Sequence, residues 1–211
     1  MSLAFVHSPD APLAEALDAG HHVVVLLHGY GADERDLAGL ATYLPRGLPW
    51  VSVRAPLRHP SFGYSWYPLD EIASPLEAPA IDAATAALWE FIDDTLHEDA
   101  RLIPVGFSQG GLMASQLLRT RVERVAAAAI LSGYVQPSPQ PADAVLADSP
   151  RPVFWGRGTA DLVIPSHAVD ITRAFLPGHS MLTERTYPNL PHSVNEDELA
   201  DLATFLRGVI A

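Results

Sequence analysis

Ser108 stands at the centre of a Gly-x-Ser-x-Gly pattern, which in a suitable setting presents a serine hydroxyl as a nucleophile. A stretch of β-strand character, residues 102–107, precedes this serine, and a stretch of helical character, residues 109–119, follows it. The turn between them is so sharp that side chains at Gly106 and Gly110 would collide with the neighbouring strand and helix. The free N–H groups at the start of the helix would favour negative charge near Ser108. We therefore predict that Ser108 is a catalytic nucleophile.

A serine hydroxyl is a poor nucleophile at neutral pH, so it needs a histidine base and a carboxylate that holds the base in one tautomer. Where strands alternate with helices, these partners follow the serine, the acid first and the histidine second, on loops after strands. Asp161 ends the loop that leaves the strand-like residues 153–155. His192 follows the strand-like residues 183–187 and precedes the last helical stretch. We predict Asp161 as the acid and His192 as the base.

Other aspartates and histidines fit these two roles less well. Asp143 and Asp148 lie in a proline-rich segment, and Asp170 lies in a predicted helix. The competing histidines either precede Ser108 or belong to predicted helices and surface turns, where a solvated imidazole is the ordinary case: His7, His21, His22, His59, His97, His167 and His179.

The tetrahedral intermediate of acyl transfer carries an oxyanion that must meet prearranged hydrogen-bond donors. One donor is expected to be the backbone N–H of Gln109, the residue after the nucleophile. The second should come from a loop after an early strand, and Leu27-His-Gly-Tyr-Gly31 follows the most apolar strand of the chain. We assign this second donor to the N–H of Tyr30.

Short apolar, branched runs alternate with longer stretches that repeat at three and four residues, which is typical of a mostly parallel sheet covered by helices on both faces. The predicted strands are 22–27, 50–54, 102–107, 125–131, 153–155 and 183–187, with 3–6 as an edge strand. The predicted helices are 34–43, 81–96, 109–119, 166–175 and 196–207. The fold class is therefore α/β.

Two proline-rich segments, residues 56–79 and 137–152, interrupt this alternation. No second core or low-complexity linker accompanies them, so we interpret them as loops of one domain that covers residues 1–211. The first is long for a plain connection and contains Phe62, Tyr64, Trp66 and Tyr67. Loops of this kind are usually functional.

The composition excludes several classes of function. With 13 basic and 25 acidic residues the formal charge is −12, and no cluster of Lys or Arg offers a patch for nucleic acid. The absence of cysteine excludes disulfides, thiol nucleophiles and Cys-ligated metal centres. No complete dinucleotide or phosphate-binding glycine motif and no metal-ligand spacing of histidines is present, so we expect no cofactor and no metal.

The sequence contains no recognisable secretory signal or membrane-spanning segment. The first twenty residues contain no Lys or Arg and carry three acidic residues, unlike a secretory signal. The longest apolar runs, 23–27 and 125–131, are far too short to cross a bilayer. We expect a cytoplasmic protein without integral membrane association.

Taken in order, the motifs make the chain similar to the carboxylesterase, phospholipase and acyl-protein thioesterase group of small α/β-hydrolases. The segments that carry the resemblance span most of the chain: LHGYGADERDL (27–37), SWYPLD (65–70), GFSQGG (106–111), LSGY (131–134), GTADLVIP (158–165) and PHSV (191–194). The resemblance implies an α/β-hydrolase fold without a large cap domain. It also implies hydrolysis of carboxylic esters, thioesters or lysophospholipids, with nucleophile, acid and base on Ser108, Asp161 and His192.

The resemblance further implies that Trp66, in the Ser-Trp-aromatic segment, lines the acyl or alcohol site. We expect Leu69 and Met113 to complete the substrate-binding groove for a small-molecule ester, with Tyr30 at its edge. Two alternatives stay open: the aromatic loop 56–79 could dock a partner or a second copy in a homodimer, and the chain could be an inactive binding module on a hydrolase scaffold. An intact Ser-Asp-His set favours the enzyme.

Overall fold

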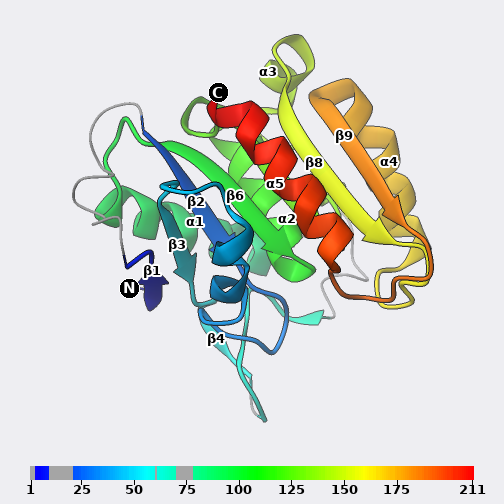
Figure 1. Ribbon diagram of the computed structural model, residues 1–211, viewed down its shortest axis with the longest axis horizontal. Helices are drawn as coiled ribbons and strands as arrows, with labels where there is room; N and C mark the ends of the chain where they lie inside the picture. The colour runs from blue at the N-terminus through cyan, green and yellow to red at the C-terminus, as the bar shows by residue number, and fades with distance from the viewer. Residues whose placement is uncertain (1–2, 10–20, 60, 70–77) are drawn as a thin grey trace.

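Seven strands form one central sheet in the computed structural model, which describes residues 3–9, 21–59, 61–69 and 78–211 (Figure 1). The strand order is β1-β3-β2-β6-β7-β8-β9; β1 is antiparallel to β3, and all other neighbours are parallel. The strands are β1 (Phe5–His7), β2 (His22–Leu27), β3 (Trp50–Val53), β6 (Arg101–Phe107), β7 (Ala128–Leu131), β8 (Arg151–Gly158) and β9 (Ser180–Tyr187). The predicted α/β class is confirmed.

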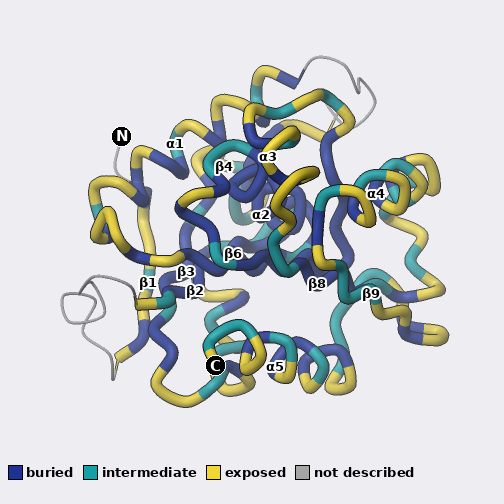
Figure 2. The backbone as a smooth tube through the Cα atoms, turned by 90° about the horizontal axis from the view of Figure 1, so that it is seen from above, coloured by how far each residue is buried: buried dark blue, intermediate teal, exposed yellow. Residues whose placement is uncertain are grey.

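Helices cover both faces of the sheet (Figure 2). One face carries α1 (Pro79–Thr95), α2 (Gln109–Thr120), α3 (Asp143–Asp148) and α4 (Ser166–His179). The opposite face carries α5 (Glu196–Ile210), and the 3-10 helix η1 (Leu37–Tyr43) shares its apolar core.

Residues of β2 show why this layering forms. Val23, Val25 and Leu27 belong to the core under α1 and α2, whereas Val24 and Leu26 belong to the core under α5. Successive side chains of a strand point to opposite faces, so a strand that is apolar throughout is stable only between two helix layers. Each such side chain contributes roughly 1.5–3 kcal/mol by leaving water.

Several elements differ from the predictions, and β8, β9 and α4 are each longer than predicted. Residues 34–36 do not begin a helix, because the Asp33 carboxylate accepts the Arg35 N–H and the Glu34 side chain turns inward to Arg54; only η1 forms beyond them. β7 begins at Ala128, three residues later than predicted, with Val125 in an isolated bridge to Leu102. The proline-rich segments contain α3 and a short hairpin, β4 (Leu57–Arg58) and β5 (Tyr64–Ser65).

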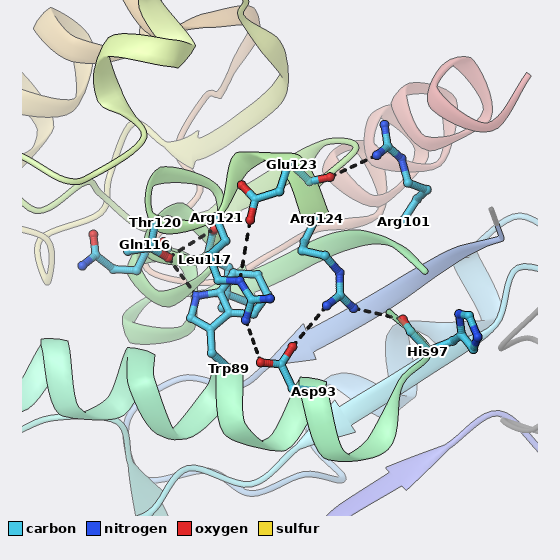
Figure 3. A network of polar contacts seen from close by, with 10 residues as sticks. All are labelled: Trp89, Asp93, His97, Arg101, Gln116, Leu117, Thr120, Arg121, Glu123 and Arg124. Atoms are coloured by element: carbon cyan, nitrogen blue, oxygen red, sulfur yellow. Dashed lines mark hydrogen bonds and ion pairs between the residues drawn. The ribbon is translucent and has the colours of Figure 1, made fainter. Parts of the chain in front are cut away.

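A polar network ties α1 to the end of α2 and to the short 3-10 helix η3 (Val122–Arg124) that follows it (Figure 3). The Asp93 carboxylate accepts hydrogen bonds from Arg121 at 2.7 Å and from Arg124 at 3.1 Å. The indole N–H of Trp89 donates to the Thr120 hydroxyl at 2.8 Å. These contacts fix the far end of the helix whose first turn follows Ser108.

None of the helices in the described part of the chain combines the length and the apolar composition that crossing a lipid bilayer requires.

Candidate active site

Ser108 occupies a strained turn between β6 and α2. Its backbone angles, φ 54° and ψ −116°, are unfavourable for any residue with a side chain, and its N–H donates to the Leu131 carbonyl at 2.9 Å. A Cβ atom on Gly106 would overlap the Gly110 carbonyl, and a Cβ atom on Gly110 would overlap the Leu27 carbonyl. The two glycines therefore let strand, turn and helix approach closely, as the pattern predicts.

The structure brings Ser108, His192 and Asp161 into one hydrogen-bonded row. The distance from His192 Nε2 to Ser108 Oγ is 2.9 Å, and the distance from His192 Nδ1 to Asp161 Oδ2 is 2.7 Å. Because a carboxylate accepts hydrogen bonds only, Nδ1 carries the proton and Nε2 is left to accept from the serine hydroxyl. The imidazole also packs against the Phe107 ring, with centroids 4.9 Å apart.

Backbone groups hold the Asp161 carboxylate in place. Its Oδ1 accepts the N–H groups of Val163 at 2.9 Å and Ile164 at 3.2 Å, which leaves Oδ2 for His192. The side chain of Asp161 is 7% exposed. Few water molecules can therefore compete for the carboxylate, and its orientation is set by the loop that carries it.

Hydrogen bonds join the loop after β8, which carries the predicted acid Asp161 (the acid loop), to the loop after β9, which carries the predicted base His192 (the base loop). The Thr159 hydroxyl accepts the Asn189 N–H at 2.8 Å, and the Ala160 N–H donates to the Leu190 carbonyl at 3.0 Å. Asn189 has a φ of 59°, a left-handed conformation that asparagine tolerates better than most residues. These hydrogen bonds tie the two loops together, which holds Asp161 and His192 in register.

The base loop leads into α5, where a carboxyl group is buried. The Asn195 side chain caps the helix by accepting the Glu198 N–H at 2.9 Å. The Glu198 side chain is fully buried, and neither of its oxygens has a hydrogen-bond partner among the described residues. Burial, with a smaller contribution from the Asp201 charge, raises the pKa of Glu198 to about 8.

A cavity of about 390 Å³ opens beside the serine hydroxyl. Its wall is mostly apolar, and Leu69 and Val163 at its rim are 48% and 62% exposed. Tyr134 belongs to the wall, its hydroxyl is hydrogen-bonded to that of Tyr67, and burial raises the pKa of Tyr134. The lining residues are Gly29, Tyr30, Ala32, Asp36, Leu69, Phe107, Ser108, Gln109, Tyr134, Val163, Ile164, Pro165 and His192.

The predicted oxyanion donors and one predicted substrate contact lie at this cavity. Tyr30, Gln109 and Leu69 all line it. Within the described residues, neither the Tyr30 N–H nor the Gln109 N–H has a hydrogen-bond partner, so both are available to a ligand.

Trp66 and Met113 lie elsewhere than predicted. Both side chains are fully buried in the core between the sheet and the helices, and neither belongs to the wall of the cavity beside Ser108. Met113 lies on α2, whose residues 109–119 are all buried, so its spacing from Ser108 alone could not tell a wall position from a core position. Asp70 of the motif that contains Trp66 lies outside the described residues.

Sequence reasoning missed the contacts of His28, which is fully buried within the predicted oxyanion loop, directly before Gly29. Its Nε2 accepts the Ala55 N–H at 3.0 Å, so Nδ1 carries the proton and donates to the Gly29 carbonyl at 2.7 Å. Burial lowers the pKa of His28, which keeps the imidazole neutral. A histidine between an apolar strand and a glycine-rich loop was the only signal in the sequence.

An ion pair next to the predicted oxyanion loop was also missed. Glu34 accepts two hydrogen bonds of 2.6 Å from the Arg54 guanidinium, which lies over the Tyr64 ring. The Arg54 guanidinium holds the pKa of Glu34 below its ordinary value. This pair anchors the turn after the predicted oxyanion loop to the end of β3.

Comparisons with known proteins identify the family of the chain. A model of the family described as Phospholipase/Carboxylesterase matches residues 10–210. The chain belongs to the phospholipase/carboxylesterase family. It is a carboxylic ester hydrolase with the α/β-hydrolase fold, as the motifs predict.

Members of the phospholipase/carboxylesterase family and related structures align over most of this chain. A probable carboxylesterase of rice (Oryza sativa subsp. japonica) is 22% identical over 93% of this chain and 81% of its own length. Acyl-protein thioesterase 1 of Cryptococcus neoformans var. neoformans is 26% identical over 87% of this chain and 90% of its own. The crystal structure of esterase PE8 superposes with a TM-score of 0.76 at 27% identity and covers 99% of this chain and 100% of its own.

Proposed function

We propose that this chain hydrolyses small carboxylic esters through an acyl-enzyme on Ser108, with His192 as general base and acid and Asp161 as the residue that orients it. The observation that carries the proposal is the hydrogen-bonded row from Asp161 through His192 to Ser108 Oγ at the wall of a cavity. A nucleophile, a base and an orienting carboxylate within hydrogen-bond reach of one another are the geometric signature of nucleophilic acyl transfer.

In the first half of the reaction Ser108 Oγ bonds to the carbonyl carbon of the ester, and its proton passes to His192 Nε2 over the 2.9 Å hydrogen bond. The carbonyl oxygen becomes an oxyanion, for which the N–H groups of Tyr30 and Gln109 are the donors. The C–O bond to the alcohol then breaks, and the alcohol leaves with the proton from His192.

In the second half a water molecule gives a proton to His192 Nε2 and bonds to the acyl carbon, which forms a second oxyanion. The bond to Ser108 Oγ breaks, the serine recovers its proton from His192, and the acid leaves. Asp161 keeps the imidazolium oriented and stabilises its charge in both halves.

The cavity supports small acyl groups as the preferred substrates. Pockets for small ligands usually measure about 300–1,000 Å³, and the 390 Å³ beside Ser108 lies near the lower end of this range. Its apolar wall favours the hydrocarbon part of an acyl group, and Asp36 in the lining disfavours a carboxylate there. We therefore propose short-chain esters and the matching thioesters as substrates ahead of lysophospholipids. Separately, we propose a cytoplasmic location, with which a chain that has no cysteine is compatible.

The inactive binding module is the weaker alternative. A binding role places no demand on the 2.7 Å and 2.9 Å hydrogen bonds of His192 or on the strained φ of Ser108, whereas hydrolysis requires both.

The test is turnover of p-nitrophenyl acetate, butyrate and palmitate, together with labelling by a serine-reactive fluorophosphonate. The wild-type protein should form one adduct on Ser108 and turn over the short esters faster than palmitate. Ser108→Ala and His192→Ala should each lower kcat by about 10⁴-fold or more, and Asp161→Asn by about 10⁴-fold.

Ser115→Ala is the matched control, because Ser115 is a buried serine of the same helix whose hydroxyl donates to the Leu112 carbonyl. It should keep the wild-type kcat. Absence of both turnover and adduct in the wild-type protein would favour the binding module, and full activity of His192→Ala would move the base role to another residue.

A further inference from the structure

The segment 64–67 lies behind the oxyanion donors rather than at the substrate. Trp66 and Tyr67 are fully buried, and Trp66 is absent from the wall of the cavity that Ser108 and His192 share. A buried tryptophan still needs a partner for its indole N–H. The partners of Trp66 therefore indicate what it does.

One side of the segment holds the loop that carries Tyr30. The Trp66 indole N–H donates to the His28 carbonyl at 2.8 Å, and the two backbone bonds between Tyr64 and the neighbouring residues Gly31 and Ala32 are also 2.8 Å long. His28 Nδ1 holds the next carbonyl, that of Gly29, at 2.7 Å. The peptides before and after Gly29 are thus both fixed at their oxygen atoms.

The peptide that is fixed through the Gly29 carbonyl is the one that presents the Tyr30 N–H. A trans peptide is planar, with its C=O and N–H on opposite edges. Fixing the Gly29 oxygen inside the protein therefore directs the Tyr30 N–H outward, toward the cavity that both residues line.

The other side of the segment holds Gln109. The Gln109 side-chain oxygen accepts the backbone N–H of Trp66 at 3.1 Å, and the Gln109 side-chain NH₂ group donates to the Tyr67 carbonyl at 2.8 Å. This residue also supplies the second free backbone N–H at the cavity. The side chain of Gln109 is 42 and 43 residues away in sequence from the groups it clamps.

We propose that the segment 64–67 is a brace that sets the position of the Tyr30 N–H relative to the Gln109 N–H, with Trp66 as a positioning residue that contacts both sides. The inference rests on the proposed function, because it assigns a task to the two oxyanion donors. It assigns to Trp66 and to the Gln109 side chain an effect on the transition state and none on substrate binding.

The expected size of the effect follows from the chemistry of oxyanion holes. Removing one donor costs about 10²- to 10³-fold in kcat, and a shift of about 1 Å in a reacting group can cost about 10²-fold. Loosening a donor without removing it should cost less than its removal. We expect roughly tenfold losses in kcat from single changes in the brace, with KM close to the wild-type value.

Trp66→Phe keeps an aromatic ring and removes the N–H that reaches His28. Its matched control is Trp89→Phe, which removes another indole hydrogen bond of 2.8 Å from a buried tryptophan, in the network of Figure 3. Gln109→Met removes both clamp bonds and keeps the backbone N–H. Its control is Gln116→Met, at a fully buried glutamine of the same helix that donates to Gln136 at 2.8 Å.

Three measurements on each variant decide the question: the melting temperature, kcat and KM for p-nitrophenyl butyrate, and the Ki of phenylboronic acid. The boronic acid bonds to Ser108 Oγ and forms a tetrahedral adduct with an anionic oxygen, so its affinity reports on the oxyanion donors. Trp66→Phe and Gln109→Met should raise this Ki by the factor by which they lower kcat. Their controls should lower the melting temperature comparably and leave kcat and Ki unchanged.

The double variant Trp66→Phe/Gln109→Met should lose little more activity than either single variant, because both changes release the same segment. If Trp66→Phe fails to fold, the comparison of Gln109→Met with Gln116→Met carries the test. Equal kcat in variants and controls would overturn the brace. A higher KM that grows with acyl length would overturn it too, because Trp66 would then contact substrate. Absence of wild-type turnover would defeat the proposed function itself, and the brace with it.

Discussion

The buried carboxyl group of Glu198 should make the protein less stable as the pH rises from about 5 to about 8. The side chain is fully buried at the start of α5, and neither oxygen has a hydrogen-bond partner among the described residues. The nearby Asp201, one turn further along the helix, adds a negative charge and accepts the Tyr187 hydroxyl at 3.0 Å. A Cβ atom on Gly156 would overlap Glu198 Oε1, so the carboxyl group lies directly against β8.

The size of the effect follows from the raised pKa. The pKa of Glu198 rises from 4.5 to about 8, so between these values the folded protein binds a proton that the unfolded chain releases. Rising pH therefore favours the unfolded chain across this interval, and the effect levels off outside it. One pH unit corresponds to about 1.4 kcal/mol, so the loss between pH 5 and pH 8 is on the order of 4 kcal/mol.

Glu198→Gln isolates this contribution, because glutamine has the shape of a protonated glutamic acid and does not titrate. The free energy of unfolding should be measured by urea denaturation at pH 5, 6, 7 and 8 and constant ionic strength. Wild type and variant should be alike near pH 5, and the variant should be more stable by several kcal/mol at pH 8. Glu196→Gln, at an exposed position of the same helix, is the control and should follow the wild-type curve.

A difference in stability between Glu198→Gln and wild type that is the same at pH 5 and pH 8 would refute the raised pKa of Glu198. A constant difference would mean that the carboxyl group finds a partner that stabilises its charge. A variant that loses stability relative to wild type as the pH rises would reverse the sign and would show that Glu198 is ionised in the folded protein.

Two further pairs of substitutions test a close backbone approach and a buried ion pair. Gly110→Ala places a methyl group on the Leu27 carbonyl and should prevent folding or cost more than about 3 kcal/mol in urea denaturation, whereas Gly208→Ala, in open space on α5, should add about 0.5–1 kcal/mol. Equal effects would refute the close approach. Arg119→Met removes a guanidinium that is 2% exposed and bound at 2.8 Å by both Asp143 oxygens, so it should cost about 3–5 kcal/mol. Arg173→Met, at an exposed ion pair, should cost at most about 1 kcal/mol, and a similar loss in both would contradict the burial argument.

Local patterns were sufficient to predict the sheet and the row of Ser108, His192 and Asp161. A strand that is apolar at nearly every position must lie between two helix layers, so the runs 22–27 and 102–107 can be recognised from the sequence as central strands. The sharp turn at Ser108 needs glycine on both sides, and Gly106 and Gly110, two residues before and two residues after it, show this directly in the sequence. Asp161 and His192 follow from the same rule, because loops after parallel strands meet at one edge of the sheet.

The roles of Trp66, Met113 and His28 depend on contacts that no local pattern contains. Trp66 is the residue type expected of a substrate contact, yet its indole N–H donates to the carbonyl of His28, 38 positions away in the sequence. Glu34 resembles the start of a helix until Arg54, 20 residues later, draws its side chain inward. In each case the deciding free energy comes from a buried donor that must find an acceptor, and the acceptor is fixed only by the tertiary structure.

The groups expected to react come from loops, and hydrogen bonds between the loops hold them in register. Thr159 ties the loop of Asp161 to the loop of His192, and Trp66 and Gln109 tie together the two segments proposed to supply the oxyanion donors. The sheet fixes where each loop begins. The precise positions of the groups expected to react, to within tenths of an ångström, depend on these few hydrogen bonds. Changes in the sheet should therefore appear mainly in the free energy of unfolding. Changes in the bonds between loops should lower kcat in addition to any loss of stability.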